Sequence, residues 1–219
     1  MVRPTKIIAA CLAPLTLALG ACQEVPRTYS TKAADGEVIF RDAFDGDTLS
    51  ADWNATHPDG VVVDNGLLKL SDLQNRPLWL RKELPDDVRI EFDALSTTEQ
   101  GDIKVELAGD GVSVAKSLNY VATGYVVIFG GWNNSLNAIC RKREHGRDRQ
   151  TVGEPTVEPG RRYHFAITRS AGEVRWELDG QEILVLEDNQ PLRGKGHNHF
   201  AFSGWEAETH FDNLVIEAL

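Results

Sequence analysis

Short segments in which apolar and polar residues alternate recur along most of the chain. The segment 88–94 (VRIEFDA) has an apolar side chain at every second position, and segments 103–107 and 163–167 repeat this arrangement. A period of two is typical of antiparallel strands that bury one face, so we expect Lys104 and Glu106 on a solvent-exposed face. About a dozen such segments, without a convincing helix among them, predict an all-β fold: a two-sheet antiparallel jelly-roll sandwich.

The first 21 residues have the features of a signal peptide. Arg3 and Lys6 precede an apolar run over 7–19, which is too short for a comfortable membrane span. The run Leu-Gly-Ala-Cys that ends at Cys22 resembles a bacterial lipobox, which implies cleavage before Cys22 and a lipid on its sulfur. The alternative is an ordinary secretory signal with a chance cysteine. Gln23 follows, not Asp, so the resemblance to Gram-negative lipoproteins implies the outer membrane, on its periplasmic or its external side.

Residues 22–36 are polar, include Pro26 and lack periodicity, which predicts a tether between the lipid and a folded domain. We expect that domain to span residues 37–219, a length that suits one large β domain. The net charge of −10 argues against nucleic acid as a partner and against electrostatic binding to anionic lipid. We therefore expect a monomer that reaches the membrane through its lipid anchor.

The three cysteines do not predict a disulfide framework. Cys11 would leave with the signal peptide and Cys22 would carry lipid, which leaves Cys140 alone. A single cysteine in a strand is more often a small buried apolar residue than a nucleophile.

The segment 124–149 is the strongest candidate for a binding site. Its pattern predicts two strands with a break between them at Gly130-Gly131, which is followed by Trp132 and two asparagines. An aromatic ring beside planar amides and charged groups suits a sugar, because the ring stacks on the apolar sugar face while the polar groups bind hydroxyls. A hairpin with a solvated tip is the alternative. The candidate sugar-binding residues are Trp132, Asn133, Asn134, Arg141, Glu144 and His145, with Trp79 and Trp205 as further stacking surfaces. Core packing is the alternative for Trp79 and Trp205, and it is the expectation for Trp176, which is in step with Val174 and Leu178.

Glu144 and His145 are also the candidate catalytic residues. A carboxylate and an imidazole near Asp148 and several arginines could act as general acid and base on a glycoside or a uronate. An ion-paired loop is the alternative that we favour, because such loops are common.

Three stretches resemble one family of sandwiches. The segment 40–53 (FRDAFDGDTLSADW), the pair of strands within 161–180 and the closing segment 211–216 (FDNLVI) are similar to those of concanavalin A-like lectin/glucanase domains of the laminin G-like jelly-roll type. The central segment looks closest to a secreted bacterial branch of unknown function that is associated with polysaccharide breakdown. The resemblance covers residues 37–219 and implies the fold, and it transfers no catalytic residue.

The chain departs from the best-known enzymes of that family. Laminarinase-type hydrolases carry two catalytic carboxylates on one strand in the pattern E-x-D-x-x-E. Here Glu91 and Asp93 match the first two positions of this pattern, but Glu99 comes too late to match the third. We therefore expect Glu91 and Asp93 to lie on the exposed face of a strand. The Q-I-H motif of jelly-roll alginate lyases is absent as well.

Two groups of residues in the sequence are candidate metal sites. Many relatives bind one structural calcium between the first and last strands, and the oxygen-rich candidates here are Asp42, Asp45, Asp47 and Asp212. A solvated acidic turn is the alternative. His197 and His199 would place two imidazoles on one strand face, but no third ligand follows at a recognisable spacing, so a polar loop is favoured.

These observations lead to one functional hypothesis and two alternatives. The leading hypothesis is an exported lipoprotein whose domain binds carbohydrate and acts in polysaccharide recognition. The first alternative is a glycoside hydrolase or polysaccharide lyase of the same fold. The second is an envelope protein that binds another protein through a flat apolar patch.

Overall fold

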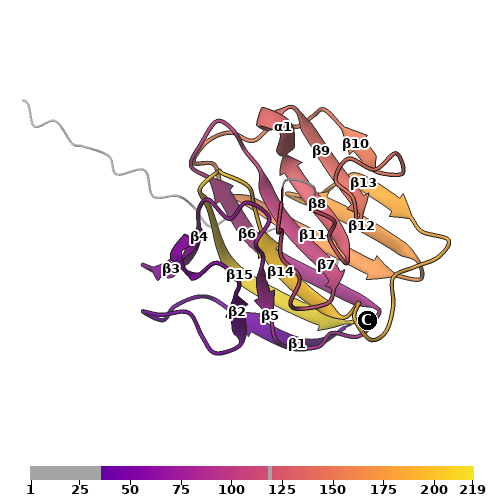
Figure 1. Cartoon of the computed structure of the whole chain (residues 1–219), viewed down its shortest axis with the longest axis horizontal. Coiled ribbons are helices and arrows are strands. Elements are labelled where there is room, and N and C mark those ends of the chain that lie inside the picture. The colour runs from indigo at the N-terminus through magenta and orange to yellow at the C-terminus, as the bar shows by residue number, and fades with distance from the viewer. Residues whose placement is uncertain (1–35, 118–119) are drawn as a thin grey trace, which may run out of the picture.

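Two antiparallel β-sheets make up the fold in the computed structural model, which describes residues 36–117 and 120–219 (Figure 1). The predicted signal peptide and most of the predicted tether, with Cys22, lie outside the described residues. Besides strands, the described chain has a 3-10 turn η1 (Pro58–Gly60) and a four-residue turn labelled α1 (Gly131–Asn134). No helix in this part of the chain is long and apolar enough to cross a membrane.

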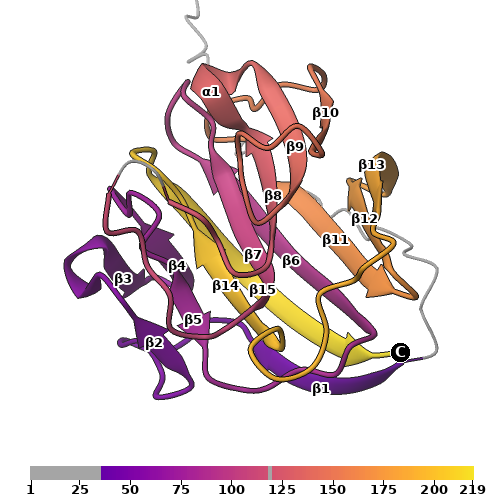
Figure 2. The same cartoon turned by 45° about the vertical axis from the view of Figure 1, so that its right-hand side comes forward.

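Each sheet brings together strands that are distant in the sequence. The eight-stranded sheet has the order β13 (Gln181–Glu187), β12 (Glu173–Leu178), β11 (Tyr163–Ser170), β6 (Val88–Ser96), β15 (Thr209–Ala218), β4 (Leu67–Leu70) and β3 (Val61–Asp64), with β1 (Glu37–Asp42) also paired to β15. The seven-stranded sheet has the order β10 (Gln150–Val152), β9 (Leu136–Arg141), β8 (Tyr125–Gly130), β7 (Ile103–Gly109), β14 (His199–Ser203), β5 (Leu78–Leu80) and β2 (Trp53–Ala55). Figure 2 shows β1 running beside the C-terminal strand β15.

The core between the sheets is aromatic. Phe92 of β6 and Phe165 of β11 stack with ring centroids 4.8 Å apart, and Trp176 of β12 stacks on Phe165 at 5.8 Å. Each ring is fully buried, and burial of a large apolar side chain stabilises a fold by about 1.5–3 kcal/mol. The prediction that Trp176 lies in the core is therefore confirmed.

The eight-stranded sheet follows the predicted alternation. Ile90 and Phe92 of β6 face the core, while the side chains of Glu91 and Asp93 are partly exposed on the outer face. There Asp93 lies 3.0 Å from Nδ1 of His164 on the neighbouring strand β11.

The seven-stranded sheet does not follow the predicted alternation, because both of its faces are covered. Every residue of β7 is buried, and Lys104 and Glu106 are only 2% and 1% exposed. The cover comes in part from residues 120–122: the hydroxyl of Tyr120 donates a hydrogen bond to Glu106, and the backbone N–H of Ala122 donates to the carbonyl of Lys142. The prediction that Lys104 and Glu106 face solvent was therefore wrong, because a connecting segment occupies the place of water.

Cys140 of β9 is buried on the same covered face, in a small apolar cluster with Val126 and Ile128. Burial, aided by the negative charge of Glu144, raises the pKa of its thiol to about 12. The thiolate is therefore scarce at neutral pH, as expected for a structural cysteine.

Replacing His164 by Gln is expected to lower the free energy of unfolding by about 1 kcal/mol at about pH 6, and by much less at about pH 9. The hydrogen bond to Asp93 raises the pKa of His164 above its ordinary value. The stabilisation is then fully present below the unfolded-state pKa of about 6.5 and is lost as pH rises through the folded-state pKa. Urea unfolding at the two pH values measures the difference.

Asp93→Asn is the matched variant, because it removes the negative charge that favours the protonated imidazole and should reproduce the same pH dependence. Burial raises the pKa of Asp93, but hydrogen bonds from His164 and Asn213 outweigh this and lower it, so the carboxylate is ionised at both pH values. An equal loss of stability at both pH values in His164→Gln would contradict the interpretation.

Candidate functional site

The predicted hairpin is present, and its tip has an unusual backbone. Strand β8 ends at Gly130 and β9 begins at Leu136, which confirms the predicted break at the glycine pair. Between them Trp132, Asn133 and Asn134 all have positive φ, at 52°, 58° and 59°. Asparagine tolerates this left-handed conformation, whereas a tryptophan in it is an outlier, and such outliers cluster at functional sites.

Hydrogen bonds from distant parts of the chain hold this turn. The amide of Asn134 forms two bonds with the backbone of Val157: its Oδ1 accepts from the N–H at 2.8 Å, and its Nδ2 donates to the carbonyl at 2.7 Å. Oδ1 of Asn137 accepts from the N–H of Gly130 at 2.9 Å. These bonds compensate for the strain and fix the position of Trp132.

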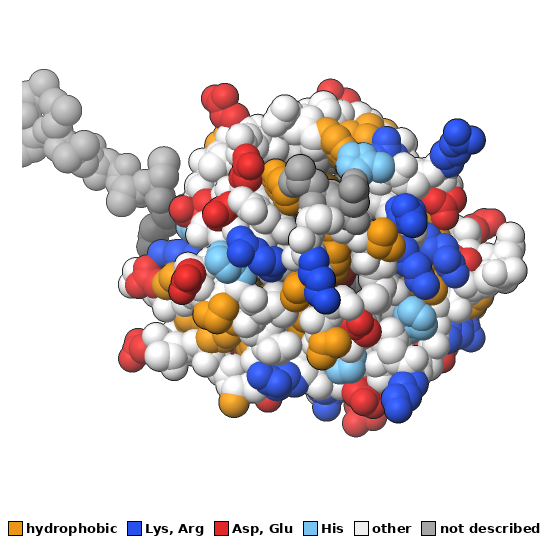
Figure 3. Space-filling view, viewed as in Figure 1, with side chains coloured by type: hydrophobic (Ala, Val, Ile, Leu, Met, Phe, Trp, Pro, Cys, Tyr) orange, Lys and Arg blue, Asp and Glu red, His pale blue; other side chains and the backbone are white. Residues whose placement is uncertain are grey.

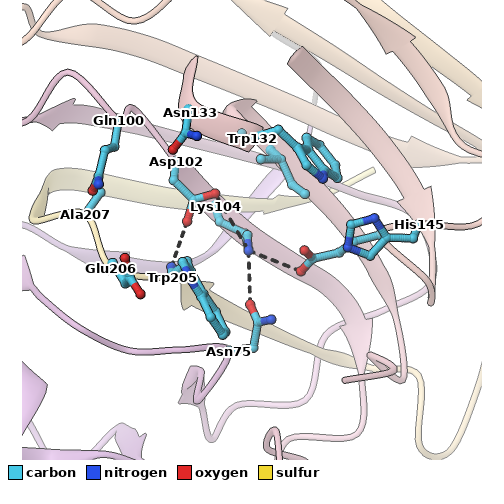
Figure 4. A pocket seen from close by; sticks show the side chains of 13 residues that line it. Asn75, Gln100, Asp102, Lys104, Trp132, Asn133, His145, Trp205, Glu206 and Ala207 are labelled. Atoms are coloured by element: carbon cyan, nitrogen blue, oxygen red, sulfur yellow. Dashed lines mark hydrogen bonds and ion pairs between the residues drawn. The ribbon is translucent and has the colours of Figure 1, made fainter. Parts of the chain in front are cut away.

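A pocket of about 330 Å³ opens beside this turn, on the covered face of the seven-stranded sheet. Trp132 and His145 line one part of it and Trp205, just after β14, lines another, with Lys104 of β7 between them (Figure 4). The polar amides in its wall are Asn75, Gln100 and Asn133. Two indoles and several convergent polar groups are the usual content of a small-ligand site.

Asp102 connects the two tryptophan-bearing segments. Its backbone N–H donates to the carbonyl of Gly130 at 3.0 Å, next to the left-handed turn. Its carboxylate accepts a 2.7 Å hydrogen bond from the backbone N–H of Trp205. One residue thus sets the spacing between the two indole-bearing corners of the pocket.

The ammonium group of Lys104 lies at the centre of the polar wall. Its Nζ is 3.0 Å from Oδ1 of Asn75, 3.2 Å from Oε1 of Glu144 and 3.7 Å from Oδ1 of Asp102. The lysine side chain is 3% exposed. The contact with Asn75 is a hydrogen bond, and the contacts with Glu144 and Asp102 are ion pairs that offset the buried charge.

Burial changes the protonation of this cluster. It raises the pKa of Glu106 to about 8, and the nearby charge of Glu144 acts in the same direction. Burial likewise raises the pKa of Asp102. The surrounding carboxylates outweigh burial at Lys104 and raise its pKa, so the lysine is charged at neutral pH while Glu106 is largely neutral.

Trp132 contacts two side chains of the loop that follows β9. The guanidinium of Arg149 lies 4.8 Å from the ring centroid, and the ring of His145 packs edge-on at 5.6 Å. Arg149 also donates a 2.6 Å hydrogen bond to the carbonyl of Glu144. The loop and the indole therefore hold each other in place.

Five of the predicted site residues line this one pocket: Trp132, Asn133, Glu144, His145 and Trp205. They come from the hairpin tip, the loop after β9 and the end of β14. Of the two candidate catalytic residues, Glu144 pairs with Lys104 and His145 packs against Trp132.

Three predicted binding residues lie elsewhere. Trp79 is 0% exposed, donates its indole N–H to the carbonyl of Ser113 and packs so closely on Gly109 that a Cβ there would be 2.2 Å from the ring. The side-chain amide of Asn134 is hydrogen-bonded to the backbone of Val157. Arg141 pairs with Asp188 at 2.7 Å, away from the pocket. The structure gives none of the three a place in the pocket, because each has a structural partner instead.

The predicted calcium residues have other partners as well. Asp42 accepts hydrogen bonds from the backbone of Phe44 and from the indole of Trp53, and Asp212 pairs with Arg162 at 2.9 Å. Asp45 is exposed in the turn after β1. Within the described residues, no three His, Cys, Asp or Glu side chains converge on a metal position, which also applies to His197 and His199. The calcium site stays a prediction from the resemblance.

Sequence reasoning missed Asn75, Asp102 and Lys104 in the polar wall of the pocket, and the buried Glu106 on the same face of the sheet. Strand alternation did place Lys104 and Glu106 on the face that carries the pocket, but it gave no sign that this face is covered. A charged residue at every second position from 102 to 106 was the available signal.

Known proteins resemble this chain in part of its sequence and in its fold. No protein-family model matches the chain. An extracellular exo-alpha-L-arabinofuranosidase from Streptomyces chartreusis is 24% identical over 159 residues, which is 73% of this chain. Those residues span only 18% of the length of that relative.

Solved structures with the same fold include a carbohydrate binding module, CBM66 from Bacillus subtilis, and a laminarinase from Flavobacterium sp. UMI-01. The first has a TM-score of 0.57 at 12% identity and covers 76% of this chain and 96% of the module. The second has a TM-score of 0.57 at 10% identity and covers 83% of this chain and all of the laminarinase chain. The fold is a concanavalin A-like jelly-roll sandwich, as the sequence predicted.

Lys104→Met is expected to lower the free energy of unfolding by about 3–5 kcal/mol, because it leaves Glu144 and Asp102 without their buried cation. Lys69→Met is the matched control. Its Nζ pairs with Asp64 at 2.5 Å, but at the surface, where an ion pair contributes little. Denaturant unfolding of both variants provides the comparison, and a loss in Lys104→Met no larger than in the control would contradict the assigned role.

Proposed function

We propose that this domain binds carbohydrate in the pocket between Trp132 and Trp205. The observation that carries the proposal is the combination of two indoles with three amide side chains and a fixed polar wall in one opening. Indole faces stack on sugar rings, and amides serve as both donor and acceptor for hydroxyl groups. A rigid left-handed turn under Trp132 supports the same reading, because a preorganised aromatic loses little freedom on binding.

The comparisons support a role connected with polysaccharides. The relative and the two structures named above are an arabinofuranosidase, a carbohydrate binding module and a laminarinase. The described domain is of similar extent to the whole binding module, of which it covers 96%. We propose the same general class of ligand here, and polysaccharide recognition as the role of the domain.

Binding is favoured over turnover by the state of the charged groups. Glu144, the candidate catalytic carboxylate, pairs with Lys104 at 3.2 Å. Glu106 is 1% exposed beneath Tyr120, whose hydroxyl donates to it. An acid and a base that act on a glycosidic bond must both reach the substrate.

Glycoside hydrolysis is the second candidate, because of one observation. Glu106 has its pKa raised to about 8 and lies on the same covered face as Glu144. A protonated carboxylic acid near an ionised one is the arrangement that glycosidases use. A protein–protein role has less support: the exposed large apolar residues of the described chain are scattered over several elements, and Figure 3 shows charges of both signs between apolar groups on one face.

We also propose that the protein is exported and held at the outer membrane by lipid on Cys22. The lipobox-like sequence before Cys22 motivates this, and the extracellular relative agrees with export. Metabolic labelling with a fatty acid, in the natural chain and in Cys22→Ser, tests it.

Trp132→Ala is expected to weaken polysaccharide binding strongly, because it removes one of the two indole surfaces that line the pocket. Trp132→Phe should retain part of the affinity, since a smaller aromatic face remains. The loss expected for the alanine variant is of the order of 1–3 kcal/mol, or about fivefold to 150-fold in affinity. Affinity electrophoresis against pectic, algal and β-glucan polysaccharides measures it, with unfolding curves to establish that each variant is folded.

Arg141→Ala is the control for this experiment, because Arg141 lies on β9 but outside the pocket. Its mobility in the polysaccharide gels should equal that of the natural protein. Equal retardation of Trp132→Ala and the natural protein would remove the pocket from the proposal.

Product chromatography on the same samples separates binding from turnover. Retardation without new oligosaccharides is the expected result. New oligosaccharides that disappear in Glu144→Gln would instead establish the hydrolytic candidate, while an absence of both effects across the panel would favour a protein-binding role.

A further inference from the structure

We propose that the pocket selects its ligand by charge, taking sugars that carry an ammonium group in preference to neutral sugars and rejecting uronic acids. This inference rests on the proposed function, since it concerns the same pocket. It is carried by the arrangement of the charged groups that line the pocket and by the two indoles.

The positive charge of the pocket lysine is already paired with two carboxylates. Nζ of Lys104 donates a hydrogen bond to Asn75 and forms ion pairs with Glu144 at 3.2 Å and Asp102 at 3.7 Å. A ligand carboxylate or sulfate would have to compete with these two buried carboxylates for the same cation, and separating either of them from the lysine is costly.

Carboxylates outnumber cations in the wall of the pocket. Asp102, Glu144 and Glu206 line it, whereas Lys104 is the single lysine or arginine that does so among the described residues. Burial raises the pKa of Asp102, which reduces the negative charge that this residue carries. Lys104 offsets one further charge, and Glu206 remains, exposed and without a hydrogen bond or ion pair in the described part of the chain.

Arg149 does not reverse this balance. Its guanidinium lies over Trp132 and donates to the carbonyl of Glu144, and it is not among the groups that line the pocket. The net charge of the whole chain is also negative, at −10, which attracts cationic ligands and repels anionic ones.

The indoles and the size of the pocket add to this preference. The faces of tryptophan rings attract cations, and the attraction grows when water is excluded. A volume of about 330 Å³ is at the small end of the range for ligand sites, so the pocket suits one or two sugar units rather than a long stretch of chain. A single ammonium group would then lie within reach of both the indoles and Glu206.

The test compares sugars that carry a positive, a neutral or a negative substituent on the same parent ring. Methyl glycosides of glucosamine, N-acetylglucosamine and glucuronic acid, and the same series built on galactose, are titrated into the purified protein at slightly below neutral pH. Isothermal calorimetry or ligand-observed NMR gives the affinities. The expected order is amino sugar, then N-acetyl sugar, then uronic acid, with about threefold to tenfold between the first two.

Glu206→Gln is the diagnostic variant, because the residue is exposed and the change leaves the fold intact. It should reduce the preference for the amino sugar over the N-acetyl sugar at least about threefold. Glu187→Gln on β13 of the other sheet changes the net charge by the same amount and should leave the preference unchanged. Added salt should weaken the preference in the natural protein and in the control.

The outcomes separate this inference from the proposed function. Equal affinities within a series, or stronger binding of the uronic acid, would overturn charge selection while leaving carbohydrate binding in place. A preference that falls equally in Glu206→Gln and Glu187→Gln would attribute it to overall charge and overturn the role of the pocket. If no polysaccharide in the preceding experiment and no sugar in any series binds, the proposed function itself fails.

Discussion

The ammonium group of Lys104 is held by oxygen atoms from two other segments of the chain, the loop before β5 and the loop after β9, and by Asp102 directly before its own strand. A charge buried in this way destabilises a fold unless its partners are in place, so these segments must take up their positions together. Asp102 extends the constraint, since its backbone meets the hairpin turn and its carboxylate meets Trp205. The contacts that pair this one buried charge thus also position the segments that line the pocket.

The same cluster explains why the candidate enzyme and the candidate binding module are close alternatives. The covered face of the sheet carries several carboxylates, as a glycosidase would, but Lys104 stands among them. A cation at this place holds Glu144 in an ion pair, while burial and the charge of Glu144 raise the pKa of Glu106 and leave it largely neutral under Tyr120. The charges are arranged to stabilise one another, which favours recognition of a ligand over chemistry on it.

The sequence alone was sufficient for the fold and for part of the site. Alternation predicted the two sheets, Trp176 in the core and a hairpin broken at Gly130-Gly131, because these depend on local pattern. It failed for Lys104 and Trp79, because local pattern does not say which connecting segment will cover an outer face. Asn134 resembled a ligand-binding amide, yet its partner is Val157, a contact that only the folded chain reveals.

The left-handed turn under Trp132 has a consequence for grafting. A designer who moves the β8–β9 hairpin to another sandwich would transfer the indole but not its support, which comes from Val157 and from the corner at Asp102. Without them, three consecutive residues with positive φ would relax to ordinary conformations and the ring would change direction. The transplantable unit is therefore discontinuous: a hairpin, a corner and a distant backbone segment that must travel together.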